Sequence, residues 1–198
     1  GEEDILRFAK RLREISKPFV VAANKVDVPE AEEFLERLRS LKEPVIPTSA
    51  ESELILRRAA AAGLIRYEPG DPGFEIVDES KLTEAQRRAL KLVEERVLDR
   101  FGSTGVQEAL ETAVFRVAGF VAVFPVENEN RLSDRDGRVL PDVFIMERGS
   151  TVRDLAYRIH SEIGERAIGG LDVRTRRMVP LDRELRHRDV LKILARRG

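Results

Sequence analysis

Two short apolar runs, each set between stretches of helical periodicity, constrain the fold of this chain most. Residues 19–23 (Phe-Val-Val-Ala-Ala) are continuously apolar, which is typical of a parallel strand buried on both faces. Residues 44–47 (Pro-Val-Ile-Pro) form a second short run. Apolar residues recur at helical spacing around these runs, over residues 5–15, 29–38 and 51–64. This alternation predicts an α/β fold with a parallel sheet, and two strands alone leave that sheet incomplete.

Helices are expected to dominate the middle of the chain. Residues 66–78 form a Pro- and Gly-rich connection, and a helix is predicted over residues 83–101. Gly102 should close this helix, and Thr104 should cap a shorter one that ends near Phe115.

From residue 119 onward the hydrophobic period changes from that of helices to that of strands. Two strands, residues 121–126 and 142–147, are expected on either side of a polar turn region. One helix with inward-facing residues between 152 and 163 should follow, and then strands at 168–173 and 190–194. A hairpin, one helix and further short strands in this order are typical of the β-grasp (ubiquitin-like) fold.

These patterns divide the chain into residues 1–65, part of an α/β domain; residues 66–118, a helical connector; and residues 119–198, a β-grasp domain. Charge divides in a similar way. Residues 1–118 carry 19 basic and 23 acidic side chains, net −4, whereas residues 119–198 carry 16 basic and 13 acidic, net +3. This asymmetry indicates two units with different partners.

Composition excludes several kinds of site. Cys is absent, which excludes disulfides, thiolate zinc sites and a cysteine nucleophile. Two His cannot form a histidine-rich metal cage, and His160 is expected on a helix face rather than at a metal. No apolar stretch reaches about 18 residues and the first residues lack a signal pattern, so we expect a soluble, cytoplasmic protein without a membrane partner. Five Asn and Gln against 28 Arg and 7 Lys are typical of a hot environment, although a GC-rich genome favours Arg as well.

The most informative residues are Asn24, Lys25 and Asp27, in the sequence Asn-Lys-Val-Asp directly after the first apolar run. The second run is followed by Thr-Ser-Ala, which includes Ser49 and Ala50. In open α/β sheets, ligands bind at the carboxyl ends of parallel strands, where both motifs are expected. The alternative is that the aspartate only caps the helix that follows it.

This pair of motifs resembles the base-recognition half of the P-loop GTPases. The resemblance implies that the Asp27 carboxylate accepts hydrogen bonds from N1–H and the 2-amino group of guanine, and that the Lys25 stem packs over the base. It also implies that Asn24 braces the site, that the Ala50 amide donates to guanine O6, and that Ser49 orients the loop. GTP and Mg²⁺ are the cofactors that the resemblance implies for the complete protein.

The phosphate-binding part of such a site has no counterpart in this sequence. A phosphate loop has the pattern G-x-x-x-x-G-K-[ST], and no Gly of this chain is followed by Lys. The chain therefore resembles the later part of a GTPase, without the N-terminal half that binds phosphate and magnesium. We assign no catalytic or metal-binding residue, and expect the chain alone to be inactive and to hold no cofactor tightly.

The second half resembles a TGS domain, the β-grasp module shared by threonyl-tRNA synthetases, certain GTPases and stringent-response enzymes. The stretches that carry this resemblance are residues 124–126, 137–141, 148–152, 154–160 and 185–193. A partial G domain, a helical connector and a TGS domain in this order are similar to the YchF-type branch of the Obg-related GTPases, especially its archaeal members. Many YchF-type proteins have Glu in place of Asp27 and prefer ATP, so guanine is the expected base here.

Six arginines lie within fifteen residues of the basic half: Arg174, Arg176, Arg177, Arg183, Arg186 and Arg188. One interpretation is contact with RNA phosphates, as on a ribosome or tRNA. The alternative is a solvated surface balanced by the acidic neighbours Asp172, Asp182, Glu184 and Asp189. No aromatic residue lies among the arginines, so base stacking is not supported, and DNA is not an expected partner.

The expected function is guanine-nucleotide binding within a translation- or ribosome-associated GTPase, with the TGS domain contacting RNA or another partner. The rival hypothesis is a non-enzymatic RNA- or protein-binding adaptor built on the β-grasp domain, in which residues 24–27 form only a turn.

Overall fold

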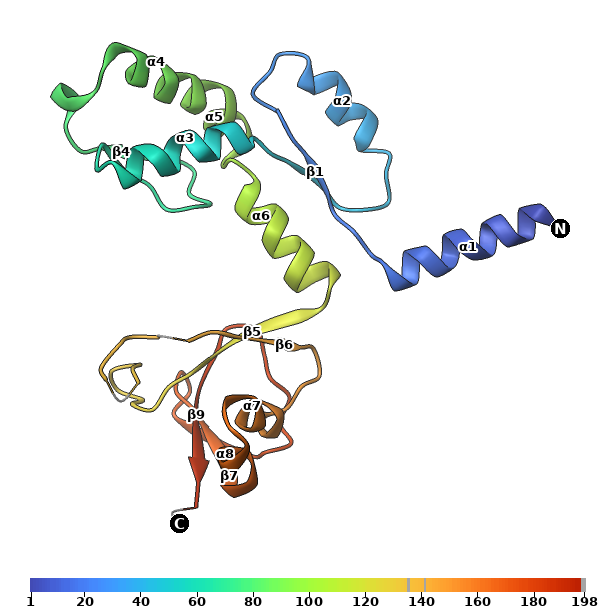
Figure 1. Cartoon of the computed structure of the whole chain (residues 1–198), viewed down its shortest axis with the longest axis vertical. Helices are drawn as coiled ribbons and strands as arrows, with labels where there is room; N and C mark the ends of the chain where they lie inside the picture. Colours follow the sequence, from blue (N-terminus) through green and yellow to red (C-terminus); the bar gives the residue numbers. More distant parts are fainter. Residues whose placement is uncertain (135, 141, 197–198) are drawn as a thin grey trace. The chain divides into compact units, whose positions relative to one another are not determined.

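Figure 1 shows the computed structural model of the chain, which describes residues 1–134, 136–140 and 142–196. Arg135 and Pro141 of the predicted turn region and TGS stretches lie outside the described residues, as does the side chain of Ile15. The chain forms two compact units, residues 1–118 and residues 119–198.

A two-stranded parallel sheet organises the first unit. β1 (Val21–Ala23) pairs with β2 (Val45–Pro47), and Val21 lies opposite Val45. α2 (Ala31–Leu38) lies between the two strands in sequence, because a parallel pair needs a crossover connection. The α/β prediction for this part of the chain is confirmed.

α1 (Glu2–Ser16) precedes the sheet and carries the predicted periodic apolar residues. Its apolar face is open to solvent, since Ile5, Phe8 and Leu12 are 70%, 68% and 55% exposed. Contiguous apolar surface of this kind usually marks a contact site. Helical periodicity thus predicts the helix, but no described residue buries its apolar face.

The hydrophobic core of the first unit lies among the helices after β2. α3 (Ala50–Ala61) begins directly after that strand and packs against α4 (Glu84–Val93). A short antiparallel pair, β3 (Ile65–Arg66) and β4 (Glu75–Ile76), replaces the irregular connection that the sequence predicts, and η1 (Glu79–Lys81) follows it. The core residues are Leu56, Ile65, Tyr67, Leu82, Leu90, Val93 and Leu98.

The predicted long helix forms with a π-helical segment inside it. α4 continues into η2 (Glu94–Leu98) and α5 (Asp99–Phe101), and Gly102 ends the helix in a left-handed conformation, as predicted. The next helix, α6 (Val106–Glu111), continues into a second π-helical segment, η3 (Thr112–Val117).

The second unit is built on a mixed sheet with the strand order β6-β5-β9-β7-β8. β5 (Phe120–Pro125) and β6 (Phe144–Glu147) form the predicted antiparallel hairpin, and β5 pairs in parallel with β9 (Asp189–Ala195). β7 (Ala167–Asp172) pairs with β9 and with the short edge strand β8 (Arg177–Val179), which the sequence pattern misses. The β-grasp prediction is confirmed.

The helical part of the second unit departs from the prediction. Thr151 caps α7 (Val152–Ile159), but the chain is extended at His160, which ends α7 and begins α8 (Ser161–Arg166). The His160 ring caps α8, because its Nδ1 accepts the Glu162 N–H at 3.3 Å. The prediction of one continuous helix, with His160 on its face, is therefore wrong. The core beside these helices contains Val121, Val123, Met146, Val152, Leu155, Leu185 and Leu191.

Candidate functional site

The ends of β1 and β2 bring the two sequence motifs together. The Thr48 N–H donates to the Ala23 carbonyl at 2.9 Å, and the Val26 N–H donates to the Thr48 carbonyl at 3.2 Å. Val26 is 1% exposed, so the loop between Asn24 and Asp27 is anchored by a buried apolar side chain. Both loops consequently lie at the carboxyl edge of the sheet, where ligands bind in α/β folds.

Two hydrogen bonds join the predicted site residues across these loops. The Ser49 hydroxyl donates to Asp27 Oδ1 at 2.8 Å, and the Ala50 N–H donates to Asn24 Oδ1 at 3.0 Å. Lys25 has a left-handed backbone (φ 71°), and its exposed side chain has no hydrogen-bond or ion-pair partner among the described residues. The structure therefore brings four of the five predicted residues into direct contact.

The helix-cap interpretation of Asp27 does not hold. α2 begins at Ala31, its N-cap residue is Glu30, and no side chain caps it by a hydrogen bond. The Asp27 carboxylate is half-buried and turned instead to the Ser49 hydroxyl of the neighbouring loop. Its position is set by the contact between the loops rather than by the helix that follows it.

A third loop, residues 102–105, contacts the Ser49 loop, and the sequence pattern does not predict this contact. The Ser49 N–H donates to the Thr104 carbonyl at 2.9 Å. The predicted capping role of Thr104 is wrong, because its hydroxyl donates to Glu53 Oε2 at 2.5 Å and Gly105 takes the N-cap position of α6. A threonine before a helix is a common cap, and only the long-range contact with α3 reveals its other use.

Glu53 is a buried carboxylate with three donors. Besides Thr104, Tyr67 donates its hydroxyl proton at 2.7 Å and Arg57 donates its Nε–H at 2.6 Å. Burial alone raises the pKa of Glu53, but the hydrogen bonds from Thr104, Arg57 and Tyr67 outweigh it and hold the pKa below its ordinary value. Burial and the bond to Glu53 raise the pKa of Tyr67 to about 12. Glu53 therefore stabilises the fold above the ordinary carboxyl pKa, and this contribution is lost as the pH falls through the lowered pKa.

Gly105 should be the most sensitive glycine of this region. Its φ is +73°, and a Cβ added there would lie 1.8 Å from the Pro47 carbonyl oxygen. We expect Gly105→Ala to lower the free energy of unfolding by about 3–5 kcal/mol, from backbone strain and overpacking together. Gly102 is a matched control, because its φ is +76° but a Cβ would meet open space. Gly102→Ala should cost only about 1–2 kcal/mol in urea unfolding, and equal losses for both variants would contradict this account.

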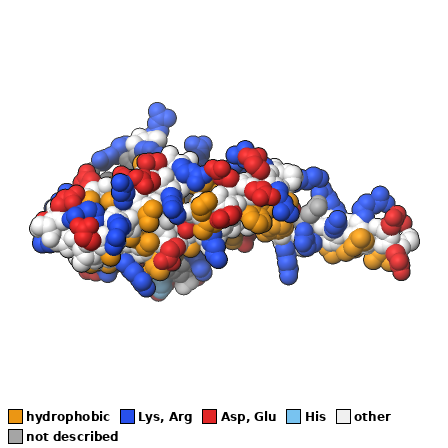
Figure 2. Space-filling model, turned by 90° about the horizontal axis from the view of Figure 1, so that it is seen from above, with side chains coloured by type: hydrophobic (Ala, Val, Ile, Leu, Met, Phe, Trp, Pro, Cys, Tyr) orange, Lys and Arg blue, Asp and Glu red, His pale blue; other side chains and the backbone are white. Residues whose placement is uncertain are grey.

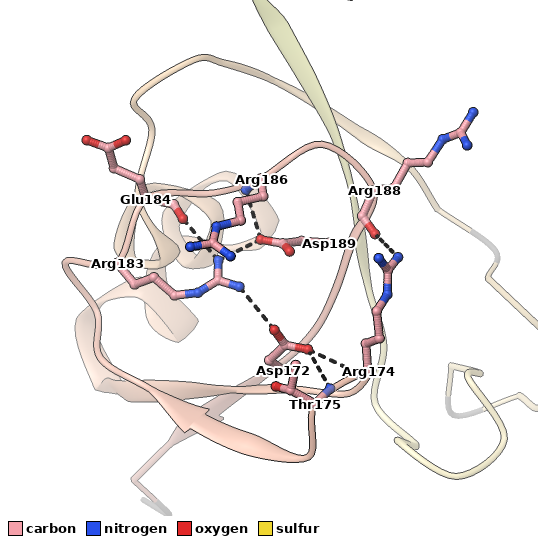
Figure 3. Close-up of polar contacts among 8 residues, drawn as sticks. All are labelled: Asp172, Arg174, Thr175, Arg183, Glu184, Arg186, Arg188 and Asp189. Carbon is pink, nitrogen blue, oxygen red and sulfur yellow. Dashed lines mark hydrogen bonds and ion pairs between the residues drawn. The ribbon is translucent and has the colours of Figure 1, made fainter.

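The second candidate site is the arginine cluster, and Figure 3 shows the polar contacts that Arg183 and Arg174 make within it. Arg183 is 17% exposed and bridges two carboxylates, Asp189 at 2.6 Å and Asp172 at 3.3 Å. Burial raises the pKa of Asp172, but the Thr175 N–H and the Arg183 guanidinium outweigh it and keep that pKa below its usual value. Arg174 donates to the Arg188 carbonyl at 3.1 Å, so two turns of the unit are tied together.

The remaining arginines of this cluster are exposed. Arg176 donates to Asn130 Oδ1 at 2.9 Å, and the side chains of Arg177, Arg186 and Arg188 have no hydrogen-bond or ion-pair partner within the described part of the chain. Figure 2 shows basic and acidic side chains interspersed over much of one face of the molecule. Of the six predicted arginines, Arg183 is the one that forms ion pairs with two partly buried carboxylates.

No helix in residues 1–134, 136–140 or 142–196 is long and apolar enough to span a membrane. Across the same ranges, no group of three or more His, Asp or Glu side chains is arranged to hold a metal ion.

Both units match known protein families. Residues 22–128 match the family described as Obg-like GTPase YGR210-like, G4 motif-containing domain, and residues 135–195 match the TGS domain. The chain is similar to the uncharacterized GTP-binding protein MJ1332 of Methanocaldococcus jannaschii, with 48% identity over 98% of this chain and 49% of the relative. It is also similar to the uncharacterized GTP-binding protein C428.15 of Schizosaccharomyces pombe, with 28% identity over 80% of this chain and 41% of the relative.

A solved structure shows the same likeness. The crystal structure of a GTP binding protein from Pyrococcus horikoshii OT3 aligns with a TM-score of 0.68 and 39% identity, over 98% of this chain and 51% of that one. The chain thus spans about half the length of the relatives it matches. On the family match, which covers more than half of its residues, the chain belongs to the YGR210-like Obg-like GTPases, with their G4 motif-containing domain and a TGS domain.

Proposed function

We propose that residues 24–27 and 49–50 recognise the guanine base of GTP in a longer GTPase. The observation that carries this proposal is the contact of Asp27 with Ser49 and of Asn24 with Ala50 at the carboxyl edge of the parallel strands. The names of the relatives, which describe GTP-binding proteins, support it.

The Asp27 carboxylate suits guanine because it only accepts hydrogen bonds. Its two oxygens offer about four lone-pair sites, and Ser49 uses one of them. The N1–H and 2-amino donors of guanine can therefore bind without displacing Ser49. The Ala50 N–H is bonded to Asn24, so guanine O6 would have to share or replace that acceptor.

Phosphate and Mg²⁺ belong to another part of the full-length protein in this proposal. No Gly of the chain is followed by Lys, and the described residues contain no cluster of metal ligands. Two features support a missing N-terminal half of the G domain as the partner: the apolar face of α1 is exposed, and β1 has a paired strand on one edge only among the described residues.

Competition binding with the full-length protein tests the proposed base recognition. GTP should displace a fluorescent guanine nucleotide at least about 30-fold better than ATP, because adenine leaves a charged acceptor unpaired. Equal displacement by the two nucleotides would contradict the proposal.

The cellular setting is part of the same proposal. We place the full-length protein in the cytoplasm, in association with the ribosome or another RNA partner. The YchF-type assignment stays a prediction, since the family match is to the YGR210-like group. The origin in a hot environment also stays a prediction, and it rests on the amide and arginine counts.

For the TGS domain we propose contact with RNA phosphates through its exposed arginines. Arg183 is held by two carboxylates, and we assign it to the support of the turns rather than to contact. Arg174, Arg176, Arg177, Arg186 and Arg188 remain the candidate contact residues. Their charge fits phosphates, but they include no stacking residue, so base recognition is not part of the proposal.

Replacing Arg176 and Arg177 together by Ala should weaken binding of bulk tRNA to the full-length protein. If both side chains neutralise phosphates, the slope of log affinity against log salt should fall by about two units, one for each lost contact. Arg153 and Arg158 of α7 provide the control, because they are also exposed and have no side-chain partner among the described residues. The same weakening in the double Ala variant of Arg153 and Arg158 would indicate a general charge effect and contradict a specific site.

A further inference from the structure

The hydrogen bonds behind the base site form a continuous path from a buried acid to Asp27. Glu53 Oε2 accepts from the Thr104 hydroxyl at 2.5 Å. The Thr104 carbonyl accepts the Ser49 N–H at 2.9 Å, and the Ser49 hydroxyl donates to Asp27 Oδ1 at 2.8 Å. Each link in this path is a direct contact between residues that are distant in sequence.

Burial makes the path rigid. Thr104 and Ser49 are 0% exposed and Glu53 is 5% exposed, so water does not compete for these bonds. Gly105 lies close against the Pro47 carbonyl, so the loop is packed directly onto the end of β2. Ser49 is also the N-cap residue of α3: its hydroxyl accepts the Ser52 N–H at 3.2 Å, and its carbonyl accepts the Glu53 N–H at 3.1 Å in the first backbone bond of that helix. The orientation of Asp27 is therefore coupled to the position of residues 103–105.

We propose that Glu53 is a positioning residue for base recognition, which holds Thr104 so that Ser49 aims the Asp27 carboxylate at the base. This inference rests on the proposed guanine-binding function. It assigns residues 103–105, expected from the sequence to lie in a connector, to the base site itself.

The chemistry of the acid favours this role. Bonds to an ionised acceptor are stronger and shorter than bonds between neutral groups, and the three donors of Glu53 converge from separate elements. A binding group must be held within about 0.5 Å to keep its geometry, and this is the task of locked supporting residues. A neutral acceptor in place of Glu53 should leave Thr104, and with it Ser49, less firmly held.

The experiment measures base selectivity in the full-length protein, with GTP and ITP as competitors. ITP lacks the 2-amino group, so the GTP-to-ITP affinity ratio reports how well Asp27 meets both guanine donors. Thr104→Val removes the hydroxyl and keeps the shape, and should lower this ratio about tenfold. Thr104→Ser restores the hydroxyl and should restore the ratio. A loss of stability alone would reduce binding of both nucleotides equally and leave the ratio unchanged.

Thr112→Val is the matched control. Thr112 is also buried, at 2% exposed, and within the described residues it has no hydrogen bond to either base loop. Its replacement should leave the GTP-to-ITP ratio at the wild-type value. A fall in the ratio with Thr112→Val equal to that with Thr104→Val would overturn the proposal.

The failure of this inference is distinguishable from failure of the proposed function. If Asp27→Asn changes base preference while Thr104→Val keeps the wild-type ratio, Glu53 does not position the site. If neither variant changes the preference, the guanine site itself is wrong. Should Thr104→Val fail to fold, Glu53→Gln takes its place, since it keeps an uncharged acceptor. It should lower the ratio about threefold, and an unchanged ratio would overturn the proposal.

Discussion

Asp27→Asn in the full-length protein should shift nucleotide preference from GTP toward XTP. An amide offers one acceptor and one donor, so its NH₂ group meets the 2-amino donor of guanine unfavourably. The 2-oxo group of xanthine accepts from the same NH₂. Asp27→Ala, which removes both acceptors, should cost about 2–5 kcal/mol of GTP binding and abolish most of the guanine preference.

The fold should survive Asp27→Asn. The amide oxygen can still accept from the Ser49 hydroxyl, which is the contact that places this side chain. Competition binding with GTP, ATP and XTP measures the switch. Asp71→Asn is a suitable control, because Asp71 is an exposed carboxylate of the same unit whose side chain has no partner in the described residues.

A variant that keeps the wild-type preference for GTP would show that Asp27 does not read the base. Capping of α2 could not explain the role of Asp27 in that case, because Glu30 rather than Asp27 takes the N-cap position of the helix. The rival hypothesis of an adaptor that works through its β-grasp unit would become the better account.

The local sequence pattern was sufficient to predict much of the fold and the two base loops, residues 24–27 and 49–50. The continuous apolar run before Asn24 predicted a strand with Asp27 after its carboxyl end, and β1 forms there, although Val21 and Ala23 are only partly buried and Ala22 is exposed. The apolar run over residues 121–126 likewise predicted β5. The local apolar pattern of a few residues determines these elements, so they can be predicted from a single sequence.

The contacts of Thr104 with Glu53 and Ser49 join residues about fifty positions apart, and no local sequence pattern predicts them. Thr104 has the sequence context of a helix cap, yet it donates to Glu53, which lies on a helix far earlier in the chain. Glu53 itself looks like an ordinary helical acid paired with Arg57 at i,i+4. His160 is similar, since periodicity continues through it while the backbone does not. Tertiary contacts decide all three positions.

This chain on its own should hydrolyse GTP no faster than the buffer blank. Catalysis in P-loop GTPases depends on Mg²⁺ and on the backbone amides and the lysine of the phosphate loop, and this sequence contains no such loop. Phosphate release measured with the purified chain, beside the full-length protein as positive control, checks the expectation. Hydrolysis above the blank that survives further purification would refute it.

Binding gives a sharper form of the same prediction. If the chain carries only the base-recognition part of the site, its contacts end at the guanine ring, and the triphosphate adds nothing to affinity. GTP and guanosine should then bind the chain equally weakly in an NMR titration, with shifts confined to residues 24–27 and 49–50. In the full-length protein, GTP should bind far more tightly than guanosine, because oriented backbone amides and Mg²⁺ then hold the phosphates. Much tighter binding of GTP than of guanosine to the chain alone would reveal a phosphate site within these residues, and the division of the nucleotide site between two halves would be wrong.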